Sequence, residues 1–288
     1  MHGIRRFFGA PWSVKVHGVR YRFKRAWSKV LPLVPLPVRL PYGGWWLAGN
    51  NVCDDAVFTA NFEVSERRFV ERFLRRGMTV LDVGDHHGFY TILAAKKVGS
   101  TGKVLAFEPS PRERERLLVH LRLNRILNRV SVFPVALGRE VAQATLYVVA
   151  GRDTGCNSLR PPAVTEPTLT VQVPVTSLDT FLAQENVTGV DFIKMDVEGA
   201  ELGVLEGAEK LLGRRPHPVI LAELADSRTS PWGYNASAIY DLLVAKGYRW
   251  FAITQDGKLR AYPRTDQFGT NLRAFPDERM AEADAFLT

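Results

Sequence analysis

The stretch of residues 78–109 constrains the fold more than any other part of the chain. It begins with an apolar run that ends at Val83, passes through the glycine-containing segment 84–88, and continues into a helical pattern that starts at Phe89. A second apolar run follows and ends at Phe107. The stretch therefore predicts a strand, a tight loop, a helix and a second strand, which is the repeating unit of an open α/β sheet.

A further helix is predicted directly after this unit. Pro111 occupies the position that proline favours at the start of a helix, and Glu113 stands three residues after Ser110. This spacing is typical of a capping box, in which the serine and glutamate side chains satisfy free amide groups of the first turn. We therefore expect the helix to begin at Pro111 and to be capped by this pair.

An acidic residue lies at or near the end of each predicted strand. Asp82 belongs to the first apolar run, and Glu108 directly follows the second. Ligands of open α/β sheets bind outside the carboxyl ends of the strands, so both carboxylates should face one crevice. Gly84 and Gly88 let the backbone approach a ligand closely. Glu108 is placed like the acidic residue that binds ribose hydroxyls in nucleotide-binding folds.

The loop between Asp82 and Gly88 does not suit a pyrophosphate. Its pattern is D-x-G-x-x-x-G rather than G-x-G-x-x-G, and the carboxylates of Asp82 and Asp85 lie where a dinucleotide would bring negative charge. A nucleoside that carries positive charge fits this loop better. S-adenosylmethionine has both an ammonium and a sulfonium group, and we expect it to be the cofactor.

Three segments of the chain resemble the FkbM family of S-adenosylmethionine-dependent methyltransferases, namely residues 82–91, 106–109 and 193–201. The resemblance extends from about Phe62 to Ile253, and the last of the three segments is its most specific part. It implies an α/β fold with the Rossmann-like sheet of class I methyltransferases. This sheet is mostly parallel, has an antiparallel last strand, and carries helices on both faces.

The expected cofactor site combines the glycine loop, the strand ends and two more distant residues. Family members usually have Ala-Asn at the positions of Asp85 and His86, so the chain departs from the family pattern there. The resemblance implies that Glu63 lies near the cofactor, although an acid in a first helical turn needs no such role. Leu137 is expected either to form an apolar wall for the adenine or to be an ordinary core residue. The full set is Glu63, Asp82, Gly84, Asp85, His86, Gly88, Glu108, Pro109, Leu137 and Asp196.

Methyl transfer from a sulfonium is an in-line displacement, so the alignment of donor and acceptor supplies much of the acceleration. A hydroxyl acceptor also loses a proton, and a nearby base would assist that step. Asp196 and Glu223 are the preferred bases because each lies at the carboxyl end of a predicted strand, where burial of an unused acid is costly. His86 and Glu198 are the alternatives.

The histidine pair of the glycine loop raises the question of a metal ion. Asp85, His86 and His87 are consecutive, but adjacent side chains on an extended loop diverge, so we expect no metal there. Cys53 and Cys156 have neither metal-ligand spacing nor a disulfide framework. Two such cysteines favour a reducing compartment, and we expect the protein to be cytoplasmic.

The positive charge of the chain is concentrated at its N-terminal end. Residues 1–53 hold nine of the 38 Lys and Arg residues and no acid, so the other 29 basic residues nearly balance the 30 acidic ones. Aromatic residues alternate with these cations, which is typical of a segment that contacts an anionic membrane surface. We consider such contact through residues 1–40, but slightly favour an extension that packs its aromatic residues on the body. No nucleic-acid partner is expected, because the body offers no basic face.

The chain divides into an extension, 1–53, a methyltransferase domain, 54–275, and a polar tail, 276–288. Within the domain, residues 150–168 form an unusually long segment that we expect to be mobile and to border the acceptor pocket. Pro174 predicts that the strand containing it lies at a sheet edge. Helices are expected over 54–76, 198–212 and 235–247, and further strands over 130–135, 144–149, 169–175, 190–195, 218–224, 250–254 and 268–275.

The sequence thus predicts an O-methyltransferase that moves a methyl group from S-adenosylmethionine to a hydroxyl of a small molecule or glycan. Two alternatives stay open. One is a nicotinamide-dependent oxidoreductase on a similar sheet, which the missing third glycine disfavours. The other is a non-catalytic protein that binds a nucleoside or an acceptor. This alternative stays open because Asp85 and His86 depart from the family pattern. The identity of the acceptor and the oligomeric state do not follow from the sequence.

Overall fold

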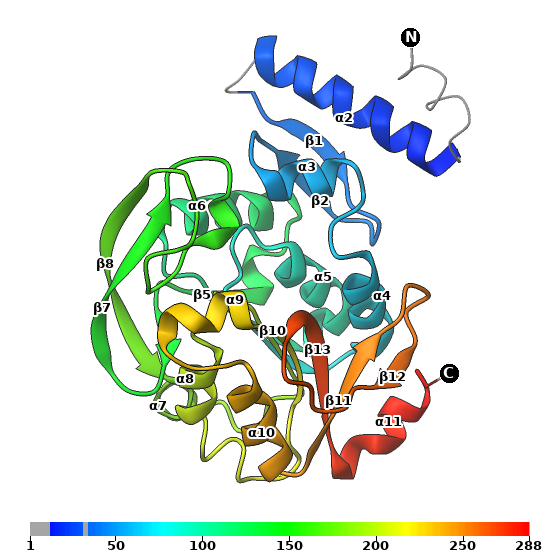
Figure 1. Ribbon diagram of the computed structural model, residues 1–288. Helices are drawn as coiled ribbons and strands as arrows, with labels where there is room; N and C mark the ends of the chain where they lie inside the picture. Colours follow the sequence, from blue (N-terminus) through cyan, green and yellow to red (C-terminus); the bar gives the residue numbers. More distant parts are fainter. Residues whose placement is uncertain (1–11, 31–33, 288) are drawn as a thin grey trace.

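The computed structural model describes residues 12–30 and 34–287, and it is built around one large β-sheet (Figure 1). The strand order is β12-β11-β13-β10-β9-β3-β4-β5. In that order the strands are Leu259–Ala261, Tyr248–Ile253, Gly269–Pro276, Val219–Ala225, Phe192–Met195, Thr79–Val83, Lys103–Phe107 and Val130–Phe133.

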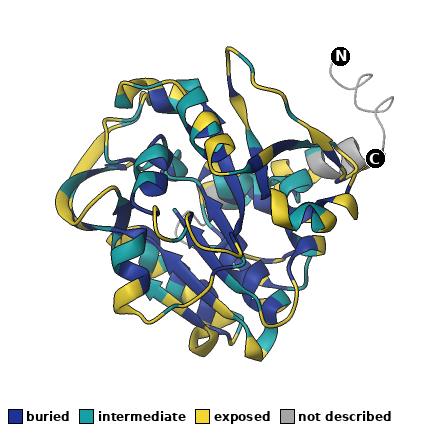
Figure 2. Cartoon of the chain, turned by 90° about the horizontal axis from the view of Figure 1, so that it is seen from below, coloured by how far each residue is buried: buried dark blue, intermediate teal, exposed yellow. Residues whose placement is uncertain are grey.

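The topology of this sheet confirms the predicted fold class. The strands from β10 to β5 are parallel to one another, whereas β13 is inserted antiparallel between β10 and β11. The central strands consist mostly of apolar residues, with Asp82 and Lys194 also buried among them, and they are covered on both faces of the sheet, as the dark blue interior in Figure 2 shows. The carboxyl ends of β3, β4 and β9 therefore meet at one edge of the sheet.

Helices cover both faces of the sheet and form two separate apolar cores. One core contains α4 (Val64–Phe73), α5 (Phe89–Val98) and α6 (Pro111–Leu123). The other contains α7 (Leu178–Gln184), α8 (Glu201–Glu206) and α10 (Ser237–Ala245). Because side chains alternate along a strand, Val80 of β3 packs in the first core and Leu81 in the second.

The unit predicted from residues 78–109 is present, but the capping box after it is not. β3 ends at Val83, α5 begins at Phe89, and Pro111 is the first residue of α6. The hydroxyl of Ser110 is buried and has no hydrogen-bond partner among the described residues. Glu113 turns away from the helix end and contacts His87 instead, so the predicted cap is wrong.

A small three-stranded sheet lies beside the main one and consists of β6 (Ala136–Gly138), β8 (Thr168–Ser177) and β7 (Ala142–Val149), in that order. The strand expected over 130–135 ends at Phe133, and the chain then enters this second sheet. The prediction that Pro174 marks an edge strand is wrong, because β8 is central. Pairing with β6 begins only at Val175, so at Pro174 the strand has a partner on one side alone.

The N-terminal part packs on the first core. After α2 (Trp12–Val30), β1 (Leu36–Arg39) and β2 (Trp45–Ala48) form an antiparallel pair that buries Trp46 against α5. The helix expected over 54–76 is two helices, α3 (Val52–Phe58) and α4. Ala60 and Glu63 adopt left-handed backbone conformations between them, which interrupts the helical path.

The C-terminal half contains three differences from the predicted elements. The helix expected over 198–212 is regular only in α8, because Glu198 and Gly199 both have positive φ and leave the helical conformation. A short helix, α9 (Asp226–Thr229), follows β10. The polar tail contains α11 (Met280–Asp284), and Phe286 after it is buried in the first core, so this part is not peripheral. Among the described helices, none is both long and apolar enough to cross a lipid bilayer.

Candidate functional site

A cleft opens where β3, β4 and β9 end, and Gly84 brings its walls together. This glycine has a φ of +77°, and a Cβ atom placed on it would lie 1.9 Å from the carbonyl oxygen of Asp196. The loop after β3 can therefore pass the end of β9 only if residue 84 has no side chain. This close approach fixes the floor of the cleft.

Glu108 lies at the tip of β4 and is buried in the cleft wall. One carboxylate oxygen accepts a hydrogen bond from the amide of His86 and the other from the amide of Ser110, each at 2.8 Å. Burial raises the pKa of Glu108 to about 8, although the two amide hydrogen bonds act in the opposite direction. The carboxyl group is thus held in one orientation.

The other walls of the cleft come from the small sheet and from the segment after β7. Leu137 of β6 forms an apolar wall, and Pro109 follows Glu108 along the same side. Thr154 and Asn157 close the cleft opposite the sheet. They belong to the segment 150–168, whose 3₁₀ turn spans Thr154–Cys156.

Asp82 and Asp85 place buried carboxylate oxygens beneath the glycine loop. Thr91 donates a hydrogen bond of 2.9 Å to one oxygen of Asp82. The other oxygen of Asp82 and both oxygens of Asp85 have no partner among the described residues. Burial, followed by the nearby Asp82, raises the pKa of Asp85 well above its usual range. A cation bound beside this pair would relieve the cost of burying them.

A second cavity lies beyond the glycine loop and shares Gly84, His86 and Asp196 with the cleft. Trp46 from β2 and Lys194 from β9 also line this cavity. The ammonium group of Lys194 donates to Asp196 at 3.1 Å. Burial alone would lower the pKa of Lys194, but the surrounding carboxylates raise it, so the lysine is a fixed cation at the edge of the cavity.

Asp196, Glu198 and Glu223 gather at the carboxyl ends of β9 and β10. Carboxylate oxygens of the three residues lie within 4.8 Å of one another, and Arg228 pairs with Glu198 at 3.0 Å. Burial, together with the charge of Asp196, raises the pKa of Glu198 to about 9 and that of Glu223 to about 7. A carboxyl group with a pKa near neutrality can accept a proton from a hydroxyl.

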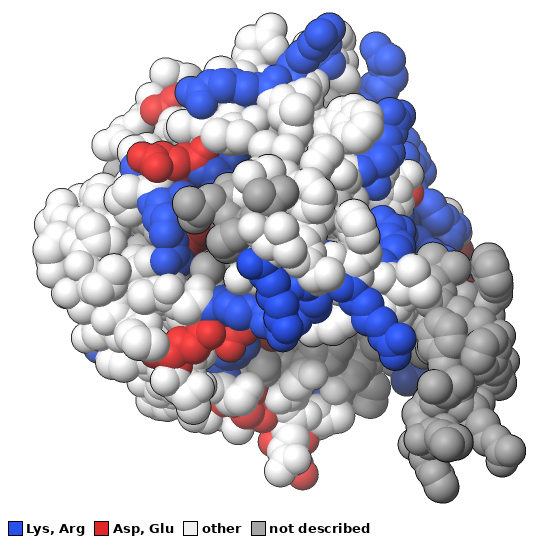
Figure 3. Space-filling view, turned by 90° about the horizontal axis from the view of Figure 1, so that it is seen from above, with Lys and Arg blue, Asp and Glu red and all other residues white. Residues whose placement is uncertain are grey.

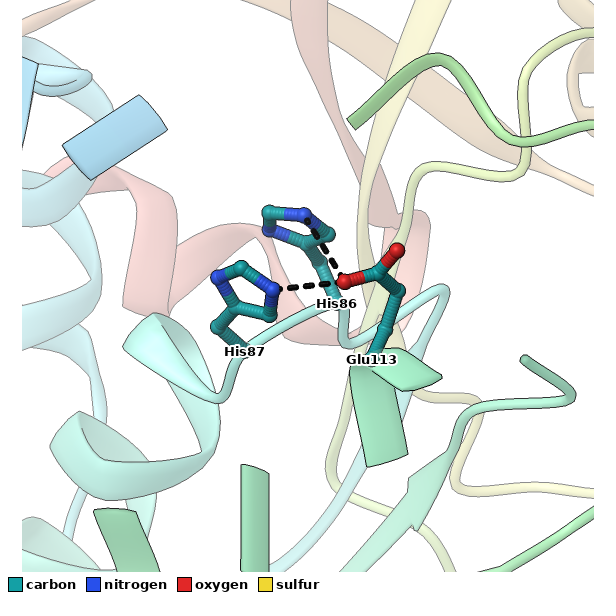
Figure 4. A group of neighbouring side chains, drawn as sticks. All are labelled: His86, His87 and Glu113. Atoms are coloured by element: carbon teal, nitrogen blue, oxygen red, sulfur yellow. Dashed lines mark hydrogen bonds and ion pairs between the residues drawn. The ribbon is translucent and has the colours of Figure 1, made fainter. Parts of the chain in front are cut away.

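The histidine pair does not diverge as predicted. His86 has a φ of +54°, and this left-handed conformation turns its ring back over His87, so that the ring centroids lie 3.7 Å apart. The Nε2 atom of His86 is 2.9 Å from the hydroxyl of Thr154, and that of His87 is 2.7 Å from Glu113 (Figure 4). Burial lowers the pKa of His86. Burial alone would raise the pKa of Glu113, but its hydrogen bond with His87 and nearby positive charges lower it to about 2.

Comparison with known proteins decides the family. The model described as Methyltransferase FkbM domain matches residues 82–250. The chain belongs to this family. A protein of Beauveria bassiana (strain ARSEF 2860) named Methyltransferase 1 is 30% identical over 146 residues, which cover 45% of this chain and 58% of that protein.

Two solved structures resemble this chain at low sequence identity. One is an O-methyltransferase from Bacillus cereus in complex with SAH, with a TM-score of 0.44, 16% identity, and coverage of 73% of this chain and 80% of that one. The other is the O-methyltransferase TomG from Streptomyces achromogenes in complex with SAM, with a TM-score of 0.44, 11% identity, and coverage of 74% and 79%.

Most of the residues predicted for the FkbM site lie together. Six of them, Gly84, His86, Glu108, Pro109, Leu137 and Asp196, line the cleft. Leu137 is also buried in the second core, so it is a core residue, and its contact with an adenine stays a prediction. Glu63 lies deeper and accepts a hydrogen bond of 2.6 Å from Tyr90, a residue of the second cavity. Gly88 faces α6, where an added Cβ would lie 2.5 Å from Leu117.

Sequence reasoning missed several residues of the site. Trp46 was not expected there because the β1–β2 pair has no strong strand signal. Lys194 appeared only as part of the family motif, and Thr154 only as part of a loop. Glu113 was assigned to a helix cap. Its spacing from His87 gave no signal, since the contact depends on how α6 packs beside the glycine loop.

Proposed function

We propose that this FkbM-family protein is a methyltransferase that uses S-adenosylmethionine and acts on a hydroxyl group of a small molecule or glycan. The observation that carries the proposal is Glu108, whose buried carboxyl group lines a cleft together with Gly84 and Leu137. Membership of a methyltransferase family over residues 82–250 supports the same conclusion.

The residues of the cleft fit the parts of this cofactor. Leu137 and Pro109 offer apolar surface to an adenine, and the carboxyl group of Glu108 is suited to ribose hydroxyls. The unpaired oxygens of Asp82 and Asp85 favour a ligand with positive charge. The glycine loop also lacks the third glycine of a dinucleotide-binding fingerprint, which disfavours the pyrophosphate of a nicotinamide dinucleotide.

When bound, the cofactor supplies an electrophilic methyl group on a sulfonium. The protein has to exclude water, align the acceptor and receive the proton of the hydroxyl. Asp196 lies at the junction of the cleft and the second cavity, and it is in contact with Lys194. Glu223, which belongs to the same acidic cluster, is the group whose pKa of about 7 suits a base at neutral pH.

Calorimetric titration with S-adenosylhomocysteine and with NAD tests the cofactor. We expect the homocysteine compound to bind and NAD not to bind. Glu108→Ala should weaken the binding by about 1–3 kcal/mol, or roughly 5- to 150-fold, because ribose hydroxyls would lose their partner. Glu115→Ala serves as the matched control, since Glu115 is exposed on the neighbouring helix α6 and should leave the affinity unchanged.

The outcomes separate the candidate functions. Binding of NAD without binding of S-adenosylhomocysteine would replace the proposal by an oxidoreductase. Equal affinities of Glu108→Ala and the unchanged chain would remove the ribose role of Glu108. Binding without methyl transfer to any acceptor in a broad panel of hydroxyl compounds would favour a non-catalytic binding protein.

A further inference from the structure

Three metal-ligand side chains converge outside the acidic cluster. His86 and His87 project from the glycine loop, and Glu113 projects toward both of them from the first turn of α6 (Figure 4). One ligand atom from each lies within 4.8 Å of the others. We propose that these three residues bind a divalent transition-metal ion of the zinc type, a function additional to methyl transfer.

The distances between the ligand atoms are close to those of a zinc site, and a small movement of the side chains would complete it. One oxygen of Glu113 lies 2.7 Å from Nε2 of His87 and 3.9 Å from Nε2 of His86. Zinc binds histidine nitrogen and carboxylate oxygen at about 2.0–2.2 Å, so neighbouring ligand atoms in a tetrahedral site are about 3.3 Å apart. The two observed distances bracket this value.

The chemical nature of the three ligands indicates which class of metal ion they would bind. Two imidazoles and one carboxylate are the ligands of many zinc and other first-row transition-metal sites, whereas calcium and magnesium prefer oxygen ligands alone. The fourth position faces the segment 150–168. The hydroxyl of Thr154 lies there, 2.9 Å from Nε2 of His86, and could act as a further oxygen ligand or hold a water molecule that does so.

The surroundings restrain two of the three ligands, although Nδ1 of His87 is buried without a hydrogen-bond partner among the described residues. Both His87 and Glu113 are buried, so their rotation is restricted. The side-chain amide of Asn157 donates to the second oxygen of Glu113 at 3.1 Å, which orients the carboxylate. The left-handed backbone of His86 stores strain that the alignment of the two rings requires, and such strain often accompanies a function.

A charged hydrogen-bond network is the rival explanation, and Arg112 distinguishes it from a metal site. Its guanidinium group also contacts Glu113, but the side chain is 42% exposed and can swing into solvent. If the carboxylate of Glu113 serves only as the hydrogen-bond partner of Arg112 and His87, removal of the arginine should remove one contact of the network and should not strengthen zinc binding. If the carboxylate is a metal ligand, the positive charge of Arg112, held at the other oxygen of Glu113, repels the ion, and its removal should strengthen binding.

The test uses the full-length chain, freed of metal with a chelator and kept without cofactor or acceptor, so that it does not depend on methyl transfer. Zinc is titrated by calorimetry, and cobalt(II) is followed by the visible absorption that low-coordinate cobalt sites give. We expect about one ion per chain. His87→Ala and Glu113→Gln should each weaken zinc binding by roughly 100-fold or more, since even indirect supports of a ligand change affinity by 10–100-fold.

His217→Ala is the matched control. His217 also pairs with a glutamate, Glu278, at 2.6 Å, but this pair has no third ligand in the described part of the chain. Zinc binding should therefore be unchanged. Should His87→Ala fail to fold, Arg112→Gln decides, because its zinc affinity is expected to rise several-fold. An unchanged affinity in Arg112→Gln, absence of zinc binding in the original chain, or equal binding by folded His87→Ala would overturn the proposal.

Discussion

Glu223 gives the site a pH dependence that can be derived from its surroundings. It extends from β10 into a cluster with Asp196 and Glu198, and burial followed by the charge of Asp196 raises its pKa to about 7. An acid with a raised pKa is protonated and inactive as a base below that value. Above it, the carboxylate is available to take the proton of a hydroxyl acceptor.

We therefore expect the rate of methyl transfer to rise with pH up to about 7 and then to level off. Glu223→Gln should reduce kcat by about 10²–10⁴-fold and abolish this rise, because glutamine cannot accept the proton. Initial rates over a series of buffers measure both effects. Glu209→Gln, an exposed residue after α8, is the control. A profile of unchanged shape in Glu223→Gln would assign the base to another residue.

At the scale of single residues, the sequence could predict the location of side chains that depends on the strands alone. Glu108 lines the cleft, as expected from the rule that strand ends meet at one edge of a parallel sheet, whereas Asp82 is buried beside Thr91 beneath the glycine loop. The contact of His87 with Glu113 could not be foreseen. It requires the left-handed conformation of His86 and a particular packing of α6, and neither has a signature in the local sequence.

Among the elements, α8 shows how a buried acid limits stability. Glu201 is the first residue of this helix and is almost fully buried. One of its oxygens accepts a hydrogen bond of 2.9 Å from the amide of Val197, and the other has no partner among the described residues. Burial raises the pKa of Glu201 to about 8 from the model-peptide value of 4.5.

The sign of the pH effect follows from this shift. The folded state binds the proton of Glu201 more tightly than the unfolded state, so the stabilising effect is fully present below about pH 4.5 and is lost as the pH rises to about 8. In Glu201→Gln, the side chain at position 201 does not titrate. The variant should therefore gain free energy of unfolding relative to the original chain between these pH values, by up to roughly 4 kcal/mol.

Urea unfolding of both chains at pH 5 and pH 8 measures this difference. Glu206→Gln changes the last residue of the same helix, a partly exposed side chain that pairs with Arg139, and should show no comparable dependence on pH. A difference between Glu201→Gln and the original chain that stays constant from pH 5 to pH 8 would contradict the prediction.

The elements themselves were predicted where apolar pattern and length agree. The strands of the large sheet other than β12, together with helices α5, α6 and α10, correspond to expected segments. Failures occurred where tertiary contact overrides periodicity. Gly199 leaves the helical path with a φ of +97°, and only glycine fits there because an added Cβ would lie 2.2 Å from the carbonyl oxygen of Arg228. The break before α4 likewise depends on the left-handed Glu63 and not on any proline or glycine.

For the molecule as a whole, the sequence favoured an N-terminal segment that packs on the body. The structure shows this packing and also leaves part of α2 exposed. Lys24 of α2 is buried and pairs with Asp55 of α3, while the ring of Phe23 stacks on Phe58 with centroids 6.4 Å apart. These contacts attach one side of α2 to the rest of the chain. Figure 3 shows basic side chains spread over the face of the molecule that carries α2.

Two stripes of α2 remain exposed beside its contact with α3. Val19 and Val30 lie at helical spacing on one face with Phe23, whose ring stays about half exposed although it stacks on Phe58. Arg25 and Lys29 are exposed beside them. An apolar stripe next to a basic one is typical of helices that lie on anionic membranes. The membrane-surface contact considered for residues 1–40 thus becomes a specific prediction about this face.

We expect the full-length chain to float with vesicles that contain phosphatidylserine and not with vesicles of phosphatidylcholine alone. Arg25→Glu with Lys29→Glu should reduce binding by at least about 2 kcal/mol, because each basic residue near such a surface contributes about 1 kcal/mol. Lys210→Glu with Arg214→Glu makes the same change of charge after α8, far from α2 in Figure 1, and should have a smaller effect. If both double variants float equally with the original chain, α2 is only a packing element, and its apolar stripe needs another explanation.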